Sequence, residues 1–381
     1  MKEISLIPAE IIVPAGRHLC EARSFQGIPS ITRTAGGRLL ACWYSGGDDE
    51  GPENFVLIAY SDDQGESWSD AAAVAEPAAD QVRAFDPSIF TAPNGEVVLF
   101  WAQSFATEAQ KMIDVRCGVF LAKLLNPDAP PETWQWTSPR RIADGLMLNK
   151  PTILKNGSAA LPISVCRNNF FGEEEVVANS GTKMYTSDAE FQDFTEQGKC
   201  LMPLEDASFD EHSFIEKNDG TLWVVIRSKF GNHESFSVDG GKNWSEPQKS
   251  AIPGPCSRLH ITRLKSGKLL LINNVLPPGE YCRIRKDLTA MLSDDDGKTW
   301  YGNLLLDGRE GVSYPDAIEG DDGFIYAVYD HQRYLCGDVL MARFSEADIA
   351  AGKVVTPGSK LQMLISSTGG VKQNNEAEKK D

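Results

Sequence analysis

A six-fold repeat constrains this chain more than any other feature of its sequence. Each copy has a short apolar strand, a turn that ends in glycine and a second strand, as in IPSITRTAGGRLLACW and YPDAIEGDDGFIYAVY. The six turn glycines, roughly 50 to 60 residues apart, are Gly37, Gly95, Gly157, Gly220, Gly267 and Gly323. A repeat of this length indicates one supersecondary unit that recurs along the chain.

Each strand pair is followed by a third strand, such as FVLIAYS in the first copy and DVLMARF in the last. With a fourth strand, every copy forms an antiparallel blade, which must pack beside other blades around an axis to bury both faces. The sequence therefore predicts an all-β fold, a single six-bladed β-propeller over residues 1–366, with a disordered polar tail over 367–381. One helix is expected near 345–352, and the apolar run 4–13 is expected to supply the outer strand that closes the ring.

A second motif marks the turn after the third strand. It occurs at Ser61–Trp68, Ser237–Trp244 and Ser293–Trp300, with a degenerate copy at Ser187–Phe194. Its Asp and Ser side chains can bond the turn's own backbone, its Gly permits positive φ, and its aromatic residue fills the space between strands. These turns resemble the Asp-boxes of sialidases and related propellers, and we interpret them as structural turns.

Composition excludes several classes of partner. Asp and Glu outnumber Lys and Arg by 54 to 37, and the net charge is -17. Nucleic acids and anionic membranes require a basic face, so neither is an expected partner. The eight Cys are scattered without a CxxC pair, and no His or Cys spacing fits a metal site, so reduced thiols and no metal or cofactor are expected. The sequence shows neither an apolar signal region nor a run long enough to span a membrane, which predicts a cytoplasmic location. A secreted or periplasmic location is the alternative if a signal was removed.

Antiparallel geometry separates the two faces of the predicted ring. First strands begin on the face where second strands end and third strands begin, whereas the Asp-boxes lie on the other face. The residues at the first-strand starts, found by counting back from each turn glycine, are Ile28, Asp86, Lys150, Glu211, Arg258 and Tyr314. Five of these six are polar or ionisable, which favours a ligand site at the mouth of the central channel. A polar, water-filled channel without a substrate is the alternative.

The loops between second and third strands add polar residues to the same face. They are Asp49, Glu50, Glu53 and Asn54 in the first copy, Arg227 in the fourth, Arg285 in the fifth, and His331 and Arg333 in the sixth. Arginines and carboxylates that face one channel suit an acidic, polyhydroxylated ligand. We therefore expect substrate contacts from these loops and from Asp86, Lys150 and Arg258.

Across nearly its whole length the chain resembles the sialidase superfamily, most closely in the last three copies. Glu211 and Arg227 flank a DG turn, Arg285 begins an Arg-x-Asp-Leu run, and Tyr314 begins a Tyr-x-Asp motif, all as in that family. The resemblance implies that Tyr314 is a nucleophile and Glu211 its base. A neutral phenol suits sialic acid, because the carboxylate on its anomeric carbon would repel an anionic nucleophile. The acid/base would be Glu50 or Asp49, and the resemblance does not choose between them.

The sequence departs from the family at one position. Sialidases hold the substrate carboxylate with three arginines, and the first of these precedes an Ile-Pro pair, where this chain has Gly27. Either Arg23, Arg258, Arg333 or Lys150 compensates, or the substrate is not an ordinary sialic acid.

The function predicted from these features is a retaining exo-glycosidase that removes a terminal acidic sugar, sialic acid or a relative, from a glycan. A propeller glycosidase or lyase for a non-sialic sugar is one alternative, and a non-catalytic glycan-binding propeller is another. The sequence does not specify an oligomeric state.

Overall fold

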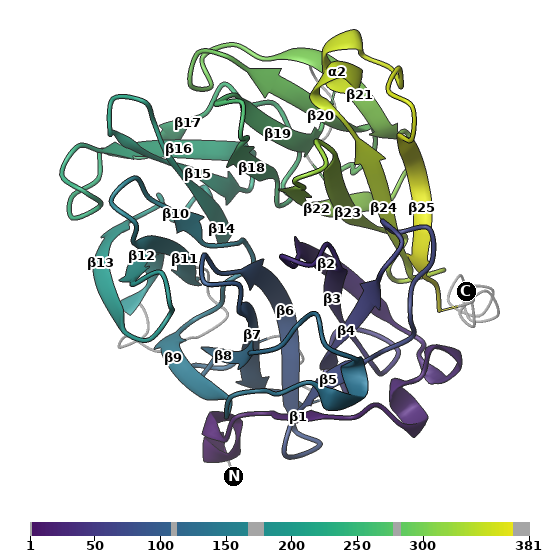
Figure 1. Cartoon of the computed structure of the whole chain (residues 1–381). Helices are drawn as coiled ribbons and strands as arrows, with labels where there is room; N and C mark the ends of the chain where they lie inside the picture. Colours follow the sequence, from purple (N-terminus) through teal and green to yellow (C-terminus); the bar gives the residue numbers. More distant parts are fainter. Residues whose placement is uncertain (1, 108–112, 167–178, 277–282, 369–381) are drawn as a thin grey trace, which may run out of the picture.

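Six antiparallel sheets stand in a ring around a common axis (Figure 1). The computed structural model describes residues 2–107, 113–166, 179–276 and 283–368. Each sheet follows the chain from the axis outward, as in the order β2-β3-β4-β5 of the first blade. The predicted all-β six-bladed propeller is therefore confirmed. The predicted tail lies outside the described residues from 369 onward.

Among the described residues, blade 1 has five strands and each of the other blades has four. Blade 1 comprises β1 (Glu10–Ile12), β2 (Gln26–Arg33), β3 (Leu39–Ser45), β4 (Phe55–Ser61) and β5 (Ala73–Glu76). Blade 2 comprises β6 (Val82–Thr91), β7 (Val97–Phe105), β8 (Gly118–Leu124) and β9 (Arg140–Asp144). Blade 3 comprises β10 (Thr152–Ile153), β11 (Ala159–Val165), β12 (Gly181–Ser187) and β13 (Phe194–Cys200). Blade 4 comprises β14 (Ala207–Glu216), β15 (Leu222–Ser228), β16 (Gly231–Ser237) and β17 (Gln248–Lys249). Blade 5 comprises β18 (His260–Arg263), β19 (Leu269–Asn274), β20 (Leu288–Ser293) and β21 (Tyr301–Asp307). Blade 6 comprises β22 (Val312–Glu319), β23 (Ile325–His331), β24 (Asp338–Phe344) and β25 (Lys360–Ser366). The helical segments are η1 (Lys2–Leu6), η2 (Gly16–His18), η3 (Cys20–Ala22), η4 (Pro131–Thr133) and α2 (Glu346–Ala351).

Apolar layers between neighbouring blades hold the ring together. The second strands β3, β11, β15 and β19 are buried along their whole length, because a blade lies against each of their faces. One apolar cluster joins Trp43 and Leu57 of blade 1 to Tyr326 and Val328 of blade 6. The first and last blades therefore pack against each other in the same way as two blades that are consecutive in the sequence.

The Asp-box turns stabilise their own backbone. In the first copy, Ser61 Oγ accepts a bond from the Gly65 N–H at 2.8 Å, and Asp63 accepts bonds from the backbone and hydroxyl of Ser67 at 2.9 and 2.6 Å. Gly65 has φ 84°, which favours glycine. The copies at Ser237–Trp244 and Ser293–Trp300 repeat these bonds. These motifs act as structural turns.

The ends of the chain differ in part from the sequence-based expectation. The expected helix is α2, capped by Ser345 and by Gly352 at φ 65°. The N-terminal strand β1, however, pairs with β5 as a fifth strand of blade 1, so it does not close the ring. Side-chain hydrogen bonds join blade 1 to blade 6 instead. Gln26 Nε2 donates to the Gly337 carbonyl at 2.6 Å, and Arg23 donates to Ser366 Oγ at 3.1 Å.

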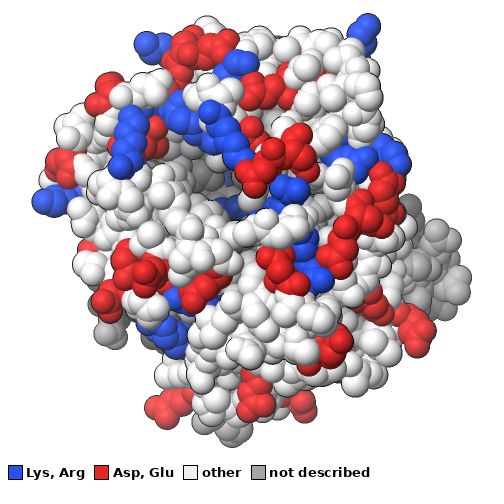
Figure 2. All heavy atoms as spheres, viewed as in Figure 1, with Lys and Arg blue, Asp and Glu red and all other residues white. Residues whose placement is uncertain are grey.

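The surface and thiols agree with the composition. One face is hollowed at its centre, with acidic and basic side chains interspersed around the hollow and no continuous basic surface (Figure 2). Within the described chain, no helix has the length and apolar character needed to cross a membrane. The cysteines of the described residues are free, and Cys282 lies outside those residues.

A buried carboxylate on the axis connects four blades. Asp316 of blade 6 accepts bonds from Ser30 Oγ at 2.6 Å and the Ile31 N–H at 2.9 Å in blade 1. It also lies 2.9 Å from Lys150 Nζ of blade 3 and 3.2 Å from His260 Nδ1 of blade 5. Burial alone would raise the pKa of Asp316, but Lys150 and His260 hold it well below its ordinary value. Ionised Asp316 therefore fastens the inner strands where they converge.

Replacing this carboxylate should weaken the whole ring. We expect Asp316→Asn to lower the free energy of unfolding by about 3–5 kcal/mol at neutral pH, because Lys150 would lose its buried counter-ion. Since the folded-state pKa is depressed, this stabilisation is present above the ordinary pKa of Asp and is lost as the pH falls. The measurement is urea denaturation, with Asp62→Asn as the control because Asp62 forms an exposed pair with Arg38. Equal stability of the two variants would contradict the prediction.

Candidate active site

Bulges at the inner-strand starts direct side chains toward the axis. The pairing register shifts in β2, β6, β14 and β22. Each shift contains a non-glycine residue with positive φ: Ile28 at 56°, Asp86 at 47°, Asp210 at 53° and Tyr314 at 54°. Such conformations cost about 1–3 kcal/mol each and persist only where surrounding contacts impose them. Three of these strained residues, Ile28, Asp86 and Tyr314, line one pocket, and Asp210 directly precedes the lining residue Glu211.

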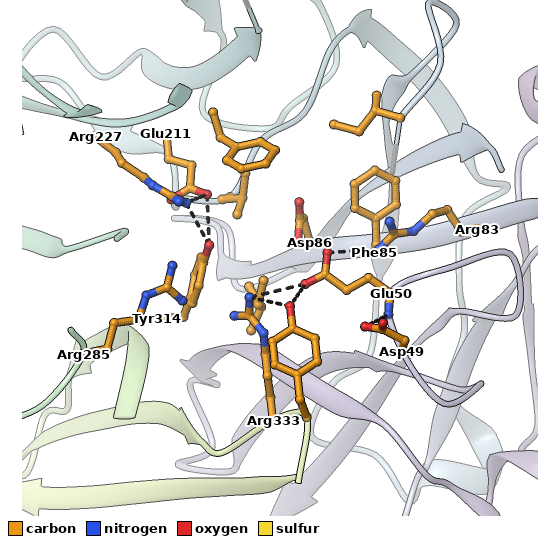
Figure 3. A pocket seen from close by; sticks show the side chains of 15 residues that line it. Asp49, Glu50, Arg83, Phe85, Asp86, Glu211, Arg227, Arg285, Tyr314 and Arg333 are labelled. Carbon is orange, nitrogen blue, oxygen red and sulfur yellow. Dashed lines mark hydrogen bonds and ion pairs between the residues drawn. The ribbon is translucent and has the colours of Figure 1, made fainter. Parts of the chain in front are cut away.

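The pocket has a volume of ≈ 460 Å³ and opens among blades 1, 2, 4, 5 and 6 (Figure 3). This volume suits a small ligand. The predicted site residues that line it are Asp49, Glu50, Asp86, Glu211, Arg227, Arg285, Tyr314 and Arg333. Ile28, from the same predicted register, also lines it. Folding therefore brings together residues from distant repeats.

Tyr314, Glu211 and Arg227 form a compact buried group. The Tyr314 hydroxyl donates to Glu211 Oε1 at 3.2 Å, and Arg227 Nη1 donates to the same oxygen at 2.7 Å and to the hydroxyl at 2.9 Å. All three side chains are nearly inaccessible to solvent. Glu211 Oε2 makes no hydrogen bond within the described part of the chain. The group can pass the phenol proton to Glu211 while Arg227 stabilises the resulting negative charge.

Three further arginines lie over the ring of Tyr314, and two of them, Arg285 and Arg333, line the pocket. The guanidinium of Arg285 lies 5.1 Å from the ring centroid, and that of Arg333 lies 4.8 Å from it. Together with Arg227, these two pocket arginines place three guanidinium groups around one phenol (Figure 3). This arrangement can bind a carboxylate through charge-assisted hydrogen bonds.

Glu50 and Asp49 occupy different environments in the loop of blade 1. Glu50 lies 3.3 Å from Arg333 and 3.9 Å from Arg83, and it accepts a bond from the Tyr334 hydroxyl at 2.7 Å. Burial opposes ionisation, but the two arginines outweigh it and lower the pKa of Glu50. Asp49 is exposed at the pocket wall. Sequence reasoning did not identify Arg83, which lies over the ring of Phe85 at 4.0 Å.

The pKa of Asp86 is shifted in the opposite direction to that of Glu50. Its carboxyl is buried, which raises its pKa to about 7, and the nearby charge of Glu50 adds to the increase. No hydrogen bond joins this carboxyl to another described residue. The pocket therefore contains a carboxyl that holds a proton near neutral pH.

Five predicted substrate contacts lie outside the pocket lining. Lys150 binds Asp316 and the carbonyls of Ile31 and Ala317. Arg258 donates to backbone carbonyls, including that of Tyr314 at 2.9 Å. The other three predicted contacts are Glu53, which is exposed, Asn54, which bonds the backbone of its own loop, and His331, which lies 3.1 Å from Asp338. Asp316 and backbone carbonyls already bind the Lys150 ammonium, and backbone carbonyls bind the Arg258 guanidinium, so both residues support the site from outside.

Comparison with known proteins identifies the family. Residues 37–327 match the BNR repeat-like domain. The chain belongs to the family of the BNR repeat-like domain. No curated protein sequence matches it.

Solved structures share the fold of this BNR propeller at low sequence identity. The intramolecular trans-sialidase from Ruminococcus gnavus is 13% identical with a TM-score of 0.64, and the alignment covers 92% of this chain and 99% of that one. Trypanosoma rangeli sialidase, solved with sialic acid, is 15% identical with a TM-score of 0.62; the alignment covers 81% of this chain but only 52% of that one. A Dyadobacter fermentans protein of unknown function is 14% identical, with a TM-score of 0.60 and coverage of 85% and 94%.

The side chain of Arg333 occupies the space beside Gly27 in the propeller. A Cβ atom at position 27 would lie 2.9 Å from Arg333 Cδ, 3.0 Å from its Cβ and 3.1 Å from Asp330 Oδ2. The absence of a side chain in blade 1 thus allows an arginine from blade 6 to cross this position. Of the four residues considered as compensation for Gly27, Arg333 alone lines the pocket.

A substitution of Gly27 should therefore act through Arg333. We expect Gly27→Ala to destabilise the BNR propeller by about 1–3 kcal/mol through overpacking. In an Arg333→Ala background the same change should cost less, with a coupling energy above about 0.5 kcal/mol. Denaturant unfolding measures the cycle. Gly51→Ala is the control, since no atom lies within 4 Å of that Cβ position. Equal costs in both backgrounds would contradict the assignment.

The raised pKa of Asp86 predicts a specific pH effect. Between about pH 4 and 7 the folded protein retains a proton that unfolded Asp releases, so this group lowers stability as the pH rises. Asparagine cannot ionise. The stability of Asp86→Asn relative to the unsubstituted protein should therefore increase by roughly 3–5 kcal/mol from pH 4 to pH 8. Urea unfolding at both pH values tests this, and a constant difference would refute the shift.

Proposed function

We propose that this chain is a sialidase-like retaining exo-glycosidase that hydrolyses a terminal acidic sugar, sialic acid or a relative, from a glycan. The observation that carries the proposal is the hydrogen-bonded group of Tyr314, Glu211 and Arg227 in a pocket with two more arginines. The solved structures that share the fold, among them a sialidase and an intramolecular trans-sialidase, support the same class.

The first chemical step forms a covalent glycosyl-enzyme. The Tyr314 oxygen attacks the anomeric carbon, its proton passes to Glu211, and the bond to the leaving oxygen breaks as that oxygen gains a proton from an acid. Water then attacks the same carbon, and the reverse proton transfers restore Tyr314. Arg227 donates to the phenol oxygen at 2.9 Å and stabilises its developing charge.

The sugar carboxylate would bind Arg227, Arg285 and Arg333. These residues flank the nucleophile, so a carboxylate on the anomeric carbon can reach them while that carbon faces Tyr314. Arg333, which crosses Gly27, supplies the third guanidinium. A carboxylate has about four acceptor positions, so contacts from the three arginines, one of them bidentate, can fix its orientation as well as add affinity.

Asp86 is the proton donor that the electrostatics favour. An acid must hold a proton near the working pH, which the raised pKa of Asp86 provides and the lowered pKa of Glu50 does not. The family resemblance instead implies Glu50 or Asp49 as the acid/base, and Asp49 is the alternative donor. Removal of the donor slows substrates with poor leaving groups more than activated ones, so comparison of two leaving groups distinguishes Asp86→Asn from Asp49→Asn.

The absence of an arginine at Gly27 keeps a second function open. A propeller that cleaves a non-sialic sugar, by hydrolysis or as a lyase, would not require a third arginine on blade 1. A non-catalytic glycan-binding propeller would need the arginines but not the proton transfer between Tyr314 and Glu211.

A substrate panel tests the proposal. The unsubstituted protein should hydrolyse an aryl sialoside, and Tyr314→Phe and Glu211→Gln should each reduce kcat at least about 100-fold because both act in the proton transfer. Tyr301→Phe, a change of the same kind on the outer strand of blade 5, should retain activity. Turnover of neutral glycosides alone would favour the non-sialic enzyme. Binding of sialosides without any turnover would favour the binding protein.

A further inference from the structure

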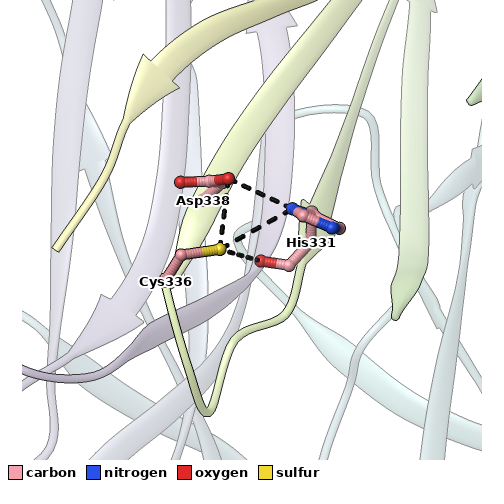
Figure 4. Close-up of side chains that lie close together, drawn as sticks. All are labelled: His331, Cys336 and Asp338. Atoms are coloured by element: carbon pink, nitrogen blue, oxygen red, sulfur yellow. Dashed lines mark hydrogen bonds and ion pairs between the residues drawn. The ribbon is translucent and has the colours of Figure 1, made fainter. Parts of the chain in front are cut away.

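A second group of reactive side chains lies at the base of the β23–β24 hairpin. His331 ends β23, Asp338 begins β24, and the two residues are paired in the strand register. Cys336, from the connecting loop, reaches back toward both side chains (Figure 4). We call these three residues the hairpin clamp. None of them lines the candidate active site.

The donor atoms of the hairpin clamp are arranged as metal ligands are. His331 Nδ1 lies 3.1 Å from Asp338 Oδ2, Cys336 Sγ lies 3.2 Å from that oxygen, and Sγ lies 3.7 Å from Nδ1. Around one tetrahedral zinc ion, nitrogen, oxygen and sulfur ligands are about 3.3–3.6 Å apart. Shifts of a few tenths of an ångström would therefore bring all three donors into one coordination sphere.

We propose that the hairpin clamp binds one Zn²⁺ or a similar thiophilic divalent cation. A thiolate, a carboxylate and a neutral imidazole together neutralise a divalent charge, and the sulfur ligand disfavours Mg²⁺ and Ca²⁺. Three protein ligands leave the fourth position to water. Without metal, the imidazole and thiol hydrogens can both point at Asp338, so binding would release the thiol proton.

The position of the clamp gives the metal a role. Between its ligands, the same hairpin carries Arg333 and Tyr334 to the pocket wall, where Tyr334 bonds Glu50. His331 and Asp338 lie on strands, and their side chains are only 13% and 19% exposed, so two ligands are already held in place. A cation there would join the two ends of the loop and restrict the motion of Arg333. The binding proposal itself does not depend on the proposed glycosidase activity.

Cobalt provides a direct test on the full-length protein. After dialysis against a chelator, one equivalent of Co²⁺ should produce the near-ultraviolet charge-transfer absorption of a cobalt–thiolate bond. Zn²⁺ should displace it and raise the Tm by at least about 3 °C at saturation, since a ligand of the folded state stabilises that state. Affinity should decrease as the pH falls, because protons compete for the ligands.

Matched variants make the result decisive. Cys336→Ser should abolish the charge-transfer band, and His331→Gln should weaken cobalt binding at least tenfold while retaining the thiol. Cys20→Ser is the control, because Cys20 is also half-buried and its Sγ lies 3.2 Å from the neighbouring Ser367 carbonyl. The absence of the band in the folded, unsubstituted protein would overturn the proposal. So would its persistence in Cys336→Ser or its loss in Cys20→Ser alone.

Discussion

The structure depends on one buried charge at the axis of the ring. Asp316 accepts bonds from blade 1 and lies within ion-pair distance of Lys150 from blade 3 and His260 from blade 5. None of the described strands is exchanged between the first and last blades, so in this part of the chain they are joined by such side-chain contacts and by the apolar layers between blades. A buried carboxylate is costly unless it is well paired, which makes this junction sensitive to substitution. Asp316 lies two residues from Tyr314, so ring closure and the pocket share one strand.

The shape of the pocket also depends on strained backbone conformations, which contacts near the axis hold in place. Tyr314 and Asp86 have positive φ within bulges, and Arg258 holds the Tyr314 carbonyl at 2.9 Å. The bulges direct side chains into the pocket that a regular strand would direct elsewhere. Supporting residues and pocket residues are thus distinct, although they come from the same register of the repeat. Arg258 and Lys150 hold the backbone, whereas Asp86 and Tyr314 face the pocket.

The repeat predicted the fold well because every blade carries the same local pattern of strand, glycine turn and second strand, and Asp-boxes mark the end of the third strand in blades 1, 4 and 5. It predicted the pocket less completely, for reasons that are physical. Contacts between distant blades decide whether a polar side chain at a strand start faces the pocket or bonds to carbonyls. Asp86 faces the pocket for this reason, whereas Lys150 and Arg258 bond to carbonyls. Arg83 escaped notice because the bulge after Phe85 breaks the two-residue alternation that would have oriented it. The match between Gly27 and Arg333 is a contact between blades 1 and 6 that no local pattern encodes.

The proposed role of Tyr314 as a nucleophile depends on ring closure. Covalent trapping with a fluorinated sialosyl fluoride, which slows hydrolysis of the glycosyl-enzyme, followed by mass spectrometry of the digested protein, tests this role. One sugar adduct is expected on the peptide that contains Tyr314, and none in Tyr314→Phe. An adduct on another residue, or turnover of sialosides that proceeds without trapping, would contradict the role of Tyr314.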